Sequence, residues 1–305
     1  MTIRTQFRNA AIIYNPASGR KGSKRERSLA RAVQLLEVHG THCTLIPTTG
    51  PGSATEQTRQ EVAAGRDLII ACGGDGTVNE VVNGMAGSEV PLALLPAGTA
   101  NILAKELGLP WNIHQAAEHI PRGRVRRIAL GKAGDRFFVC VAGAGIDAVV
   151  VRNFNRNRRA KGMLGLLAGV VEGFRQLALY DFPLFQVEAE GKTWQASQIM
   201  ICRSRSMSGP LNITQQAGLF RGHFEIVLLP KWPKAYYLAG FLADLGHSLP
   251  GFPGVRYFLT RQLKIHPNEK PVQYEIDGEW IGEIPVEIEL VPDALSLVVP
   301  EKMAE

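Results

Sequence analysis

The chain has 305 residues, of which 45% are apolar and 20% are charged. At roughly 150 residues per domain, this length indicates two domains, and the composition excludes a disordered or fibrous chain. The net charge of +6 favours anionic ligands or surfaces, but it does not by itself indicate nucleic acid, and we expect none.

The four cysteines lie far apart, and no two form a CxxC pair. We therefore expect reduced, mostly buried thiols and a cytoplasmic protein. The apolar stretch at residues 10–14 is too short for a signal peptide. No apolar run approaches the roughly 18–20 residues of a transmembrane helix, so the sequence predicts a soluble protein or one that binds peripherally at the inner membrane face.

The first 110 residues alternate between strand and helix patterns. Strand, glycine-rich loop and helix repeat in this order, which predicts an open parallel α/β sheet with helices on both faces. The predicted strands are residues 10–14, 42–47, 67–72 and 91–95, and the predicted helices are residues 24–39, 52–64 and 77–86.

After about residue 125 the pattern changes to short strands separated by turns, with one helical stretch near residues 158–179. This change predicts a first domain over residues 1–125 and an antiparallel second domain over residues 126–294. The apolar run at residues 295–299 fits either domain. The predicted strands are residues 126–132, 136–142, 184–190, 193–202, 223–229, 261–266, 272–276 and 284–290.

The strongest functional signal is the loop after the strand at residues 67–72, which reads Gly73-Gly74-Asp75-Gly76-Thr77. Its glycines let the backbone approach a phosphate closely, and the following helix points its positive end at the same place. Asp75 does not favour phosphate directly, so we expect it to hold Mg²⁺ beside the phosphates. A tight strand-to-helix turn is the alternative, and the GGDGT pattern after a buried strand favours phosphate binding over it.

Two further loops follow strands of the same predicted sheet, at residues 15–19 and 96–101. Ligands of open parallel sheets bind at the carboxyl ends of the strands, so three polar loops there predict a nucleotide site. No Walker lysine motif occurs, and GxGxxG is present only loosely, at Gly143 and Gly145.

The motifs NPxSG, GGDGTxNEVVNG, PAGTANxLA, GxGxDA and a late DGE occur in this order and resemble the diacylglycerol kinase catalytic-domain family. That family includes bacterial lipid kinases and the sphingosine and ceramide kinases. The resemblance covers nearly the whole chain. It implies an ATP-binding α/β domain, related in fold to NAD kinase and phosphofructokinase, followed by a β-sandwich lipid-substrate domain, with ATP in the cleft. It also implies that the last strand returns, so that residues 295–305 join the first domain.

The resemblance implies an ATP-dependent lipid kinase that uses Mg²⁺ and transfers the γ-phosphate to a lipid hydroxyl. Glu279 resembles the family's proton acceptor, and Asp277 would be its acidic neighbour, close to metal or to the substrate hydroxyl. Residues two apart on a strand face one side, whereas DGE alone favours a solvated hairpin turn. The implied ATP-binding residues are Asn15, Pro16, Ala17, Ser18, Gly19, Thr48, Gly73, Gly74, Asp75, Gly76, Thr77, Val78, Asn79, Glu80 and Thr99.

One position departs from the family pattern. Bacterial members often carry an Asp-Gly that holds a structural magnesium, and Arg221 stands at the corresponding place here. A cation would repel a divalent metal, so we expect no structural magnesium site at Arg221.

A basic segment precedes an apolar one in the second domain. Residues 152–161 contain no acidic residue, and the stretch at 163–174 is rich in Leu and Val. This pattern suits an anionic membrane surface, and it equally suits an ordinary helix that covers the sandwich core. Residues 235–258 are a second candidate. The basic residues are Arg152, Arg156, Arg158, Arg159 and Lys161.

Two other functions remain open at this point: a soluble-substrate kinase resembling NAD kinase, and a non-catalytic nucleotide or lipid sensor. NPxSG, PAGTAN and DGE argue against the first, and the intact GGDGT and DGE motifs argue against the second. The sequence does not select the lipid among diacylglycerol, monoacylglycerol, a sphingoid base, ceramide and other lipid alcohols. It leaves a homodimer open.

Overall fold

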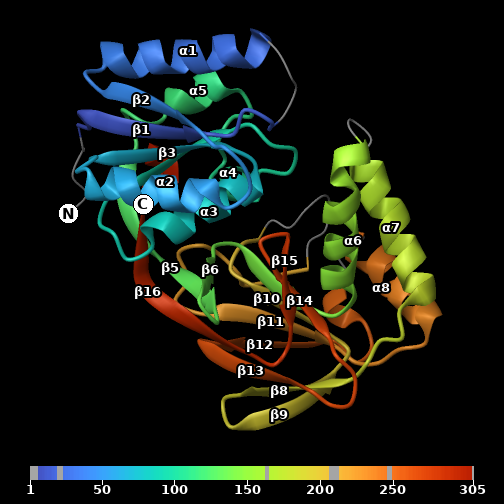
Figure 1. Ribbon diagram of the computed structural model, residues 1–305. Helices are drawn as coiled ribbons and strands as arrows, with labels where there is room; N and C mark the ends of the chain where they lie inside the picture. Colours follow the sequence, from blue (N-terminus) through green and yellow to red (C-terminus); the bar gives the residue numbers. More distant parts are fainter. Residues whose placement is uncertain (1–5, 19–22, 162–164, 206–212, 246–248, 304–305) are drawn as a thin grey trace. The chain divides into compact units, whose positions relative to one another are not determined.

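The computed structural model of the protein describes residues 6–18, 23–161, 165–205, 213–245 and 249–303. The chain forms two compact units, shown in Figure 1. Unit 1 contains Met1–Leu130 and Val291–Glu305, and unit 2 contains Gly131–Leu290.

Unit 1 is built on a parallel sheet with the strand order β2-β1-β3-β4. The C-terminal part of the last strand, β16 (Val286–Val299), pairs in parallel with β4 through Leu297 and Leu92. The remaining strands are β1 (Asn9–Tyr14), β2 (His42–Pro47), β3 (Leu68–Gly73) and β4 (Leu92–Pro96).

Helices cover both faces of this sheet, as the alternating pattern predicts (Figure 1). On one face, Leu36 of α1 and Ile113 of α5 pack on Ile12 and Ile70. Helices α2 and α3 pack together and contact the sheet. The short helices α4 and α5 were not predicted, because five residues are too few to show a helical period. The helices are α1 (Ser23–Val38), α2 (Ser53–Ala63), α3 (Asp75–Met85), α4 (Ile102–Glu106), α5 (Ile113–Ala117) and the 3₁₀ turn η3 (Glu301–Met303).

Unit 2 is an antiparallel β-sandwich, as predicted. One sheet has the order β12-β11-β10-β7-β14-β15, and the other contains β9, β8, β13 and the first part of β16, with the hairpin of β5 and β6. Phe138, Phe185, Ile201 and Phe224 lie in the buried core between the two sheets. The strands are β5 (Arg124–Ala133), β6 (Arg136–Phe138), β7 (Val141–Ala144), β8 (Phe185–Ala189), β9 (Lys192–Ala196), β10 (Gln198–Cys202), β11 (Phe224–Leu229), β12 (Arg256–Thr260), β13 (Gln262–Pro267), β14 (Gln273–Ile276) and β15 (Glu279–Glu283).

The helices of unit 2 differ from the single helix predicted near residues 158–179. Two helices occur there, α6 (Ile146–Lys161) and α7 (Gly165–Leu179), and α8 (Lys234–Leu245) and η2 (Leu249–Gly251) follow later. Helix α6 begins early because Oε1 of Gln198 accepts the N–H of Ile146 at 2.8 Å, which satisfies one of its first amides. Within the described residues, no helix combines the length and the apolar character needed to cross a membrane.

Candidate active site

The glycine-rich loop of unit 1 joins β3 to α3. A Cβ atom on Gly73 would lie 2.5 Å from the Cβ atom of Thr77, so the turn into the helix requires glycine there. Gly74 is the N-cap residue in an extended conformation, and as a glycine it has no side chain to cap the first turn. The first amides of α3, at Asp75, Gly76 and Thr77, therefore stand where a helix favours an anion.

The PAGTAN loop after β4 packs directly on this glycine-rich loop. A Cβ atom on Gly98 would lie 2.4 Å from the Cα atom of Gly74, so neither loop leaves room for a side chain at the contact. The N–H of Ala97 donates to the carbonyl of Gly73 at 2.9 Å. Thr99 is exposed at the end of the same loop. The two loops therefore form one continuous backbone surface at the carboxyl edge of the sheet.

Asp75 fastens these two loops together. Its Oδ2 atom accepts the N–H of Asn101 at 2.9 Å, and its Oδ1 atom accepts the N–H of Ile102 at 2.6 Å. These are the first amides of α4, which the negative charge of the carboxylate favours.

The NPASG loop follows β1 and reaches the glycine-rich loop. The N–H of Asn15 donates to the carbonyl of Cys72 at 3.1 Å, and its Nδ2 atom donates to Oγ1 of Thr77 at 3.4 Å. Pro16 and Ala17 are exposed, and Ser18 is half-buried. The loop after β2 joins the group, because the N–H of Thr48 donates to the carbonyl of Tyr14 at 2.8 Å. Gly19 lies outside the described residues.

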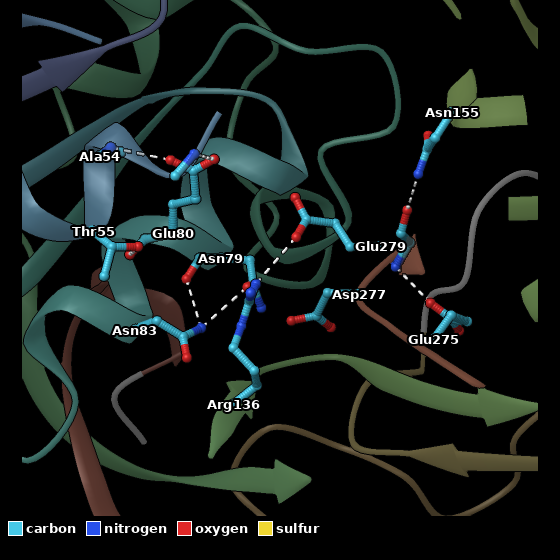
Figure 2. A network of polar contacts seen from close by, with 12 residues as sticks. Ala54, Thr55, Asn79, Glu80, Asn83, Arg136, Asn155, Glu275, Asp277 and Glu279 are labelled. Atoms are coloured by element: carbon cyan, nitrogen blue, oxygen red, sulfur yellow. Dashed lines mark hydrogen bonds and ion pairs between the residues drawn. The ribbon is translucent and has the colours of Figure 1, made fainter. Parts of the chain in front are cut away.

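The helix residues after the glycine-rich loop face the interior of unit 1. Glu80 caps α2, since its carboxylate accepts the N–H groups of Gly52 at 2.8 Å and Ala54 at 3.0 Å (Figure 2). Asn79 is buried and accepts a hydrogen bond from Nδ2 of Asn83. Val78 is half-buried. The structure thus brings the predicted nucleotide loops together and gives Glu80 a contact with α2.

In unit 2, the DGE motif forms the hairpin between β14 and β15. Asp277 and Gly278 have φ angles of 46° and 80°, which is the left-handed conformation of a two-residue hairpin loop. Asp277 is only 8% exposed. Its carboxylate accepts the N–H groups of Val139 at 2.8 Å, Cys140 at 2.8 Å and Val141 at 3.0 Å. This is why the strand predicted over residues 136–142 breaks between β6 and β7.

Glu279 points differently from Asp277, because the two residues do not share one regular strand. Its Oε2 atom lies 3.2 Å from an Nη2 atom of Arg136, as Figure 2 shows. One third of the Glu279 side chain is exposed, so this ion pair is accessible to solvent. Sequence analysis missed Arg136, since an isolated arginine on a strand carries no motif signal.

Glu275 supports the turn, and a second carboxyl group, that of Asp147, lies near it. Oε2 of Glu275 accepts the N–H of Gly278 at 2.8 Å (Figure 2). A Cβ atom on Gly143 would lie 2.1 Å from Oδ2 of Asp147 and 3.3 Å from Oε1 of Glu275. Desolvation raises the pKa of Asp147 to about 6, and desolvation together with the charge of Asp147 raises the pKa of Glu275 well above its usual value. Asp147 belongs to the GxGxDA motif, for which sequence analysis predicts no role.

The segment around Arg221 is held by a buried guanidinium. Arg203 is fully buried and donates to the carbonyls of Leu219 at 2.7 Å and Arg221 at 3.2 Å. Desolvation lowers the pKa of Arg203 to about 10, so it remains a cation at neutral pH. Glu225 accepts the N–H groups of residues 215–217 at 2.7–2.9 Å from the other side of the segment. The side chain of Arg221 is exposed.

The predicted basic membrane segment coincides with the second half of α6. Arg152 lies 5.0 Å from the ring centroid of Trp280, the residue after Glu279, so its guanidinium stacks on the hairpin. The side chains of Arg156, Arg158, Arg159 and Lys161 lie outside the described residues.

Comparisons with known proteins agree with this architecture. Residues 9–133 match the diacylglycerol kinase catalytic domain, and residues 140–299 match the YegS C-terminal NAD kinase beta sandwich-like domain. A putative diacylglycerol kinase from Bacillus anthracis has a similar fold, with a TM-score of 0.79 and 24% identity over 98% of this chain and 100% of that chain.

Curated relatives are similar over most of their length. A diacylglycerol kinase of Staphylococcus saprophyticus is 28% identical over 91% of both chains. A diacylglycerol kinase of Bacillus subtilis is 31% identical over 98% of this chain and 99% of its own. This protein therefore belongs to the diacylglycerol kinase family of lipid kinases.

Proposed function

We propose that this protein transfers the γ-phosphate of ATP to the free hydroxyl of diacylglycerol. The observation that carries the proposal is the joining of the GGDGT and PAGTAN loops through Gly74, Gly98 and Asp75, beside an α3 terminus whose N-cap residue, Gly74, has no side chain. The names of the relatives, which are similar over the whole chain, support diacylglycerol as the acceptor.

The nucleotide belongs to unit 1 in this proposal. Backbone N–H groups at the start of α3 receive the phosphates, while Asn15 and Thr48 bring two further loops to the same edge. A protein typically contributes only one or two carboxylates to Mg²⁺ that is bound with nucleotide phosphates, and Asp75 is the carboxylate that the glycine-rich loop supplies. When bound, Mg²⁺ neutralises phosphate charge as the phosphoryl group is transferred.

The acceptor hydroxyl belongs to unit 2. Glu279 accepts the hydroxyl proton as the oxygen forms its bond to phosphorus, and ADP leaves as the bridging bond breaks. Arg136, at 3.2 Å, favours the ionised carboxylate that this step requires. Asp277 and Glu275 hold the turn that presents Glu279, through the amides of residues 139–141 and of Gly278.

The product, phosphatidic acid, is a phospholipid, so the substrate resides in a membrane. We place the protein in the cytoplasm, in peripheral contact with the inner membrane face, where ATP and the lipid meet. The basic segment at residues 152–161 supports this location, because an anionic bilayer attracts lysine and arginine near its surface. All four cysteines are free thiols, which agrees with a reducing compartment.

The test is a turnover assay with radiolabelled ATP, Mg²⁺ and separate mixed micelles of diacylglycerol, monoacylglycerol, sphingosine and ceramide, with NAD as a soluble acceptor. We expect label in phosphatidic acid and a dependence on Mg²⁺. Glu279→Gln should lose turnover, while Glu287→Gln, an exposed glutamate on β16 paired with Lys264, should not.

Each other result has a definite meaning in this assay. Label in a sphingoid base or ceramide alone would replace the acceptor but retain lipid kinase activity. Label in NAD alone would contradict the proposal and support a soluble-substrate kinase. ATP binding without any turnover would identify a sensor.

A further inference from the structure

Over residues 171–179, where its side chains are described, helix α7 exposes apolar residues and buries polar ones. Residues 171, 174, 175, 178 and 179 are all exposed, and their i, i+3, i+4, i+7, i+8 spacing places them on one side of the helix. Val171, Phe174 and Leu179 on this side are 64%, 52% and 62% exposed. A surface helix that covers a core buries its apolar side and exposes its polar side, and this part of α7 does the opposite.

Polar contacts lock this orientation of α7. Glu172 and Gln176 are 5% and 7% exposed on the inner side. The Glu172 carboxylate accepts hydrogen bonds from Nδ2 of Asn153 on α6 at 2.9 Å and from Nε2 of Gln176 at 2.8 Å. Turning the helix over would break the hydrogen bond from Asn153 of α6 to Glu172, so this contact favours the orientation with the apolar side outwards.

The neighbouring helix α8 also exposes apolar side chains. Leu238 and Leu242 are 37% and 58% exposed and lie four residues apart on one side of the helix. Nζ of Lys234 at the start of α8 donates to the carbonyl of Ala178 near the end of α7, so the two helices are neighbours, as in Figure 1. We call Val171, Phe174, Leu179, Leu238 and Leu242 the α7–α8 face.

Basic side chains border the α7–α8 face. Lys270, Lys234 and Lys231 all lie close enough to Asp181, just beyond the end of α7, to lower its pKa, with the hydrogen bond from Lys270 as the largest cause. Arg175 is exposed among the apolar residues and pairs with the buried Glu172 at 3.5 Å. An apolar surface with an excess of lysine and arginine at its border is typical of a surface that binds an anionic bilayer.

We propose that the α7–α8 face inserts into the headgroup–acyl boundary of the anionic bilayer that carries the lipid substrate. The proposal rests on the lipid kinase function above, and it assigns the contact to apolar side chains of α7 and α8 rather than to the basic segment of α6 alone. A second copy of the chain suits the face less well. A two-fold contact would bring the lysine-rich borders of both copies into one interface, and like charges across an interface oppose association.

The test compares binding of the full chain to sedimenting vesicles of phosphatidylcholine alone and of phosphatidylcholine with phosphatidylglycerol. The variant is Phe174→Ser with Leu242→Ser, two exposed changes that leave the core intact. Its matched control is Val38→Ser with Trp111→Ser, which removes apolar groups that are 80% and 59% exposed in unit 1. We expect the variant to bind anionic vesicles on the order of 100-fold more weakly than wild type, and the control to bind like wild type.

A kinase assay separates this inference from the proposed function. The variant should phosphorylate monomeric dihexanoylglycerol at the wild-type rate and vesicle-embedded diacylglycerol much more slowly. Vesicle binding by the variant equal to wild type would overturn the inference. The inference would also be overturned if wild type were a dimer, the variant a monomer, and both bound vesicles equally well. If the wild-type protein binds vesicles but phosphorylates neither substrate, the proposed function is wrong. The α7–α8 face would then still be a membrane-binding surface.

Discussion

Replacing Asp277 by alanine should destabilise unit 2 strongly, because this carboxylate holds the break between β6 and β7. Asp277 is 8% exposed, and it accepts the N–H groups of Val139, Cys140 and Val141 at 2.8–3.0 Å. Alanine leaves these three buried amides without an acceptor. It also places a residue that disfavours positive φ at an angle of 46°.

The expected magnitude follows from these contacts. A hydrogen bond to a charged group contributes about 1.5–3 kcal/mol, so three of them add to roughly 4.5–9 kcal/mol before the cost of burying the carboxylate is subtracted. Single substitutions seldom exceed about 4–5 kcal/mol. We therefore expect Asp277→Ala to lower the free energy of unfolding by about 3–5 kcal/mol. Asp277→Asn keeps one oxygen acceptor and tolerates the left-handed conformation, so its loss should be smaller.

Urea unfolding followed by tryptophan fluorescence measures this loss, because Trp194, Trp232 and Trp280 report on unit 2. Glu279→Gln is the control and should unfold at the wild-type midpoint, since its partner Arg136 is itself partly exposed. An Asp277→Ala protein with a wild-type midpoint and no kinase activity would refute the reasoning, and it would assign Asp277 directly to the chemistry.

Three further predictions concern individual carboxylates and their partners. Glu279→Gln should lower kcat by about 10²–10⁴-fold with little change in ATP affinity, which single-turnover phosphorylation and nucleotide titration would measure; normal phosphoryl transfer would exclude the residue as the base. Arg136→Met should lower kcat, because the side chain that holds the Glu279 carboxylate at 3.2 Å is lost, and a wild-type kcat would contradict this. Asp147→Asn should flatten the pH dependence of the free energy of unfolding. Because the pKa of Asp147 is raised to about 6, wild type should lose stability as pH rises from about 4 through about 6. Equal pH dependence of stability in variant and wild type would contradict the raised pKa.

The sequence predicted unit 1 well because its signals are local. Buried runs such as β3 and the glycines that end them are visible within a few residues, and the predicted strands there agree with the structure to within one or two positions. In unit 2, the deviations come from distant partners. The start of α6 depends on Gln198, and the break after β6 depends on Asp277. No local pattern reveals a hydrogen bond to a residue far along the chain.

The residues of the candidate site could also be predicted from the sequence only where the signal is local. The motifs marked the loops that meet at the edge of the unit 1 sheet, because glycine and asparagine at such turns form recognisable patterns. They did not mark Arg136, Arg203 or Glu275, since each acts through a contact that only the folded chain creates. The apolar side of α7 was likewise ambiguous, because an amphipathic pattern does not say which side faces solvent.

The acidic residues of the motifs divide into two groups by what their oxygens contact. Asp75, Glu80 and Asp277 each accept backbone N–H groups with both oxygens, and thereby hold α4, α2 and the segment after β6 in place. Glu279 instead pairs with the side chain of Arg136 at a partly exposed position. Amide replacement of the first three should therefore change loop geometry, and with it stability or nucleotide affinity. Replacement of Glu279 should change the rate of the chemical step alone, which makes it the carboxylate through which proton transfer can be separated from folding.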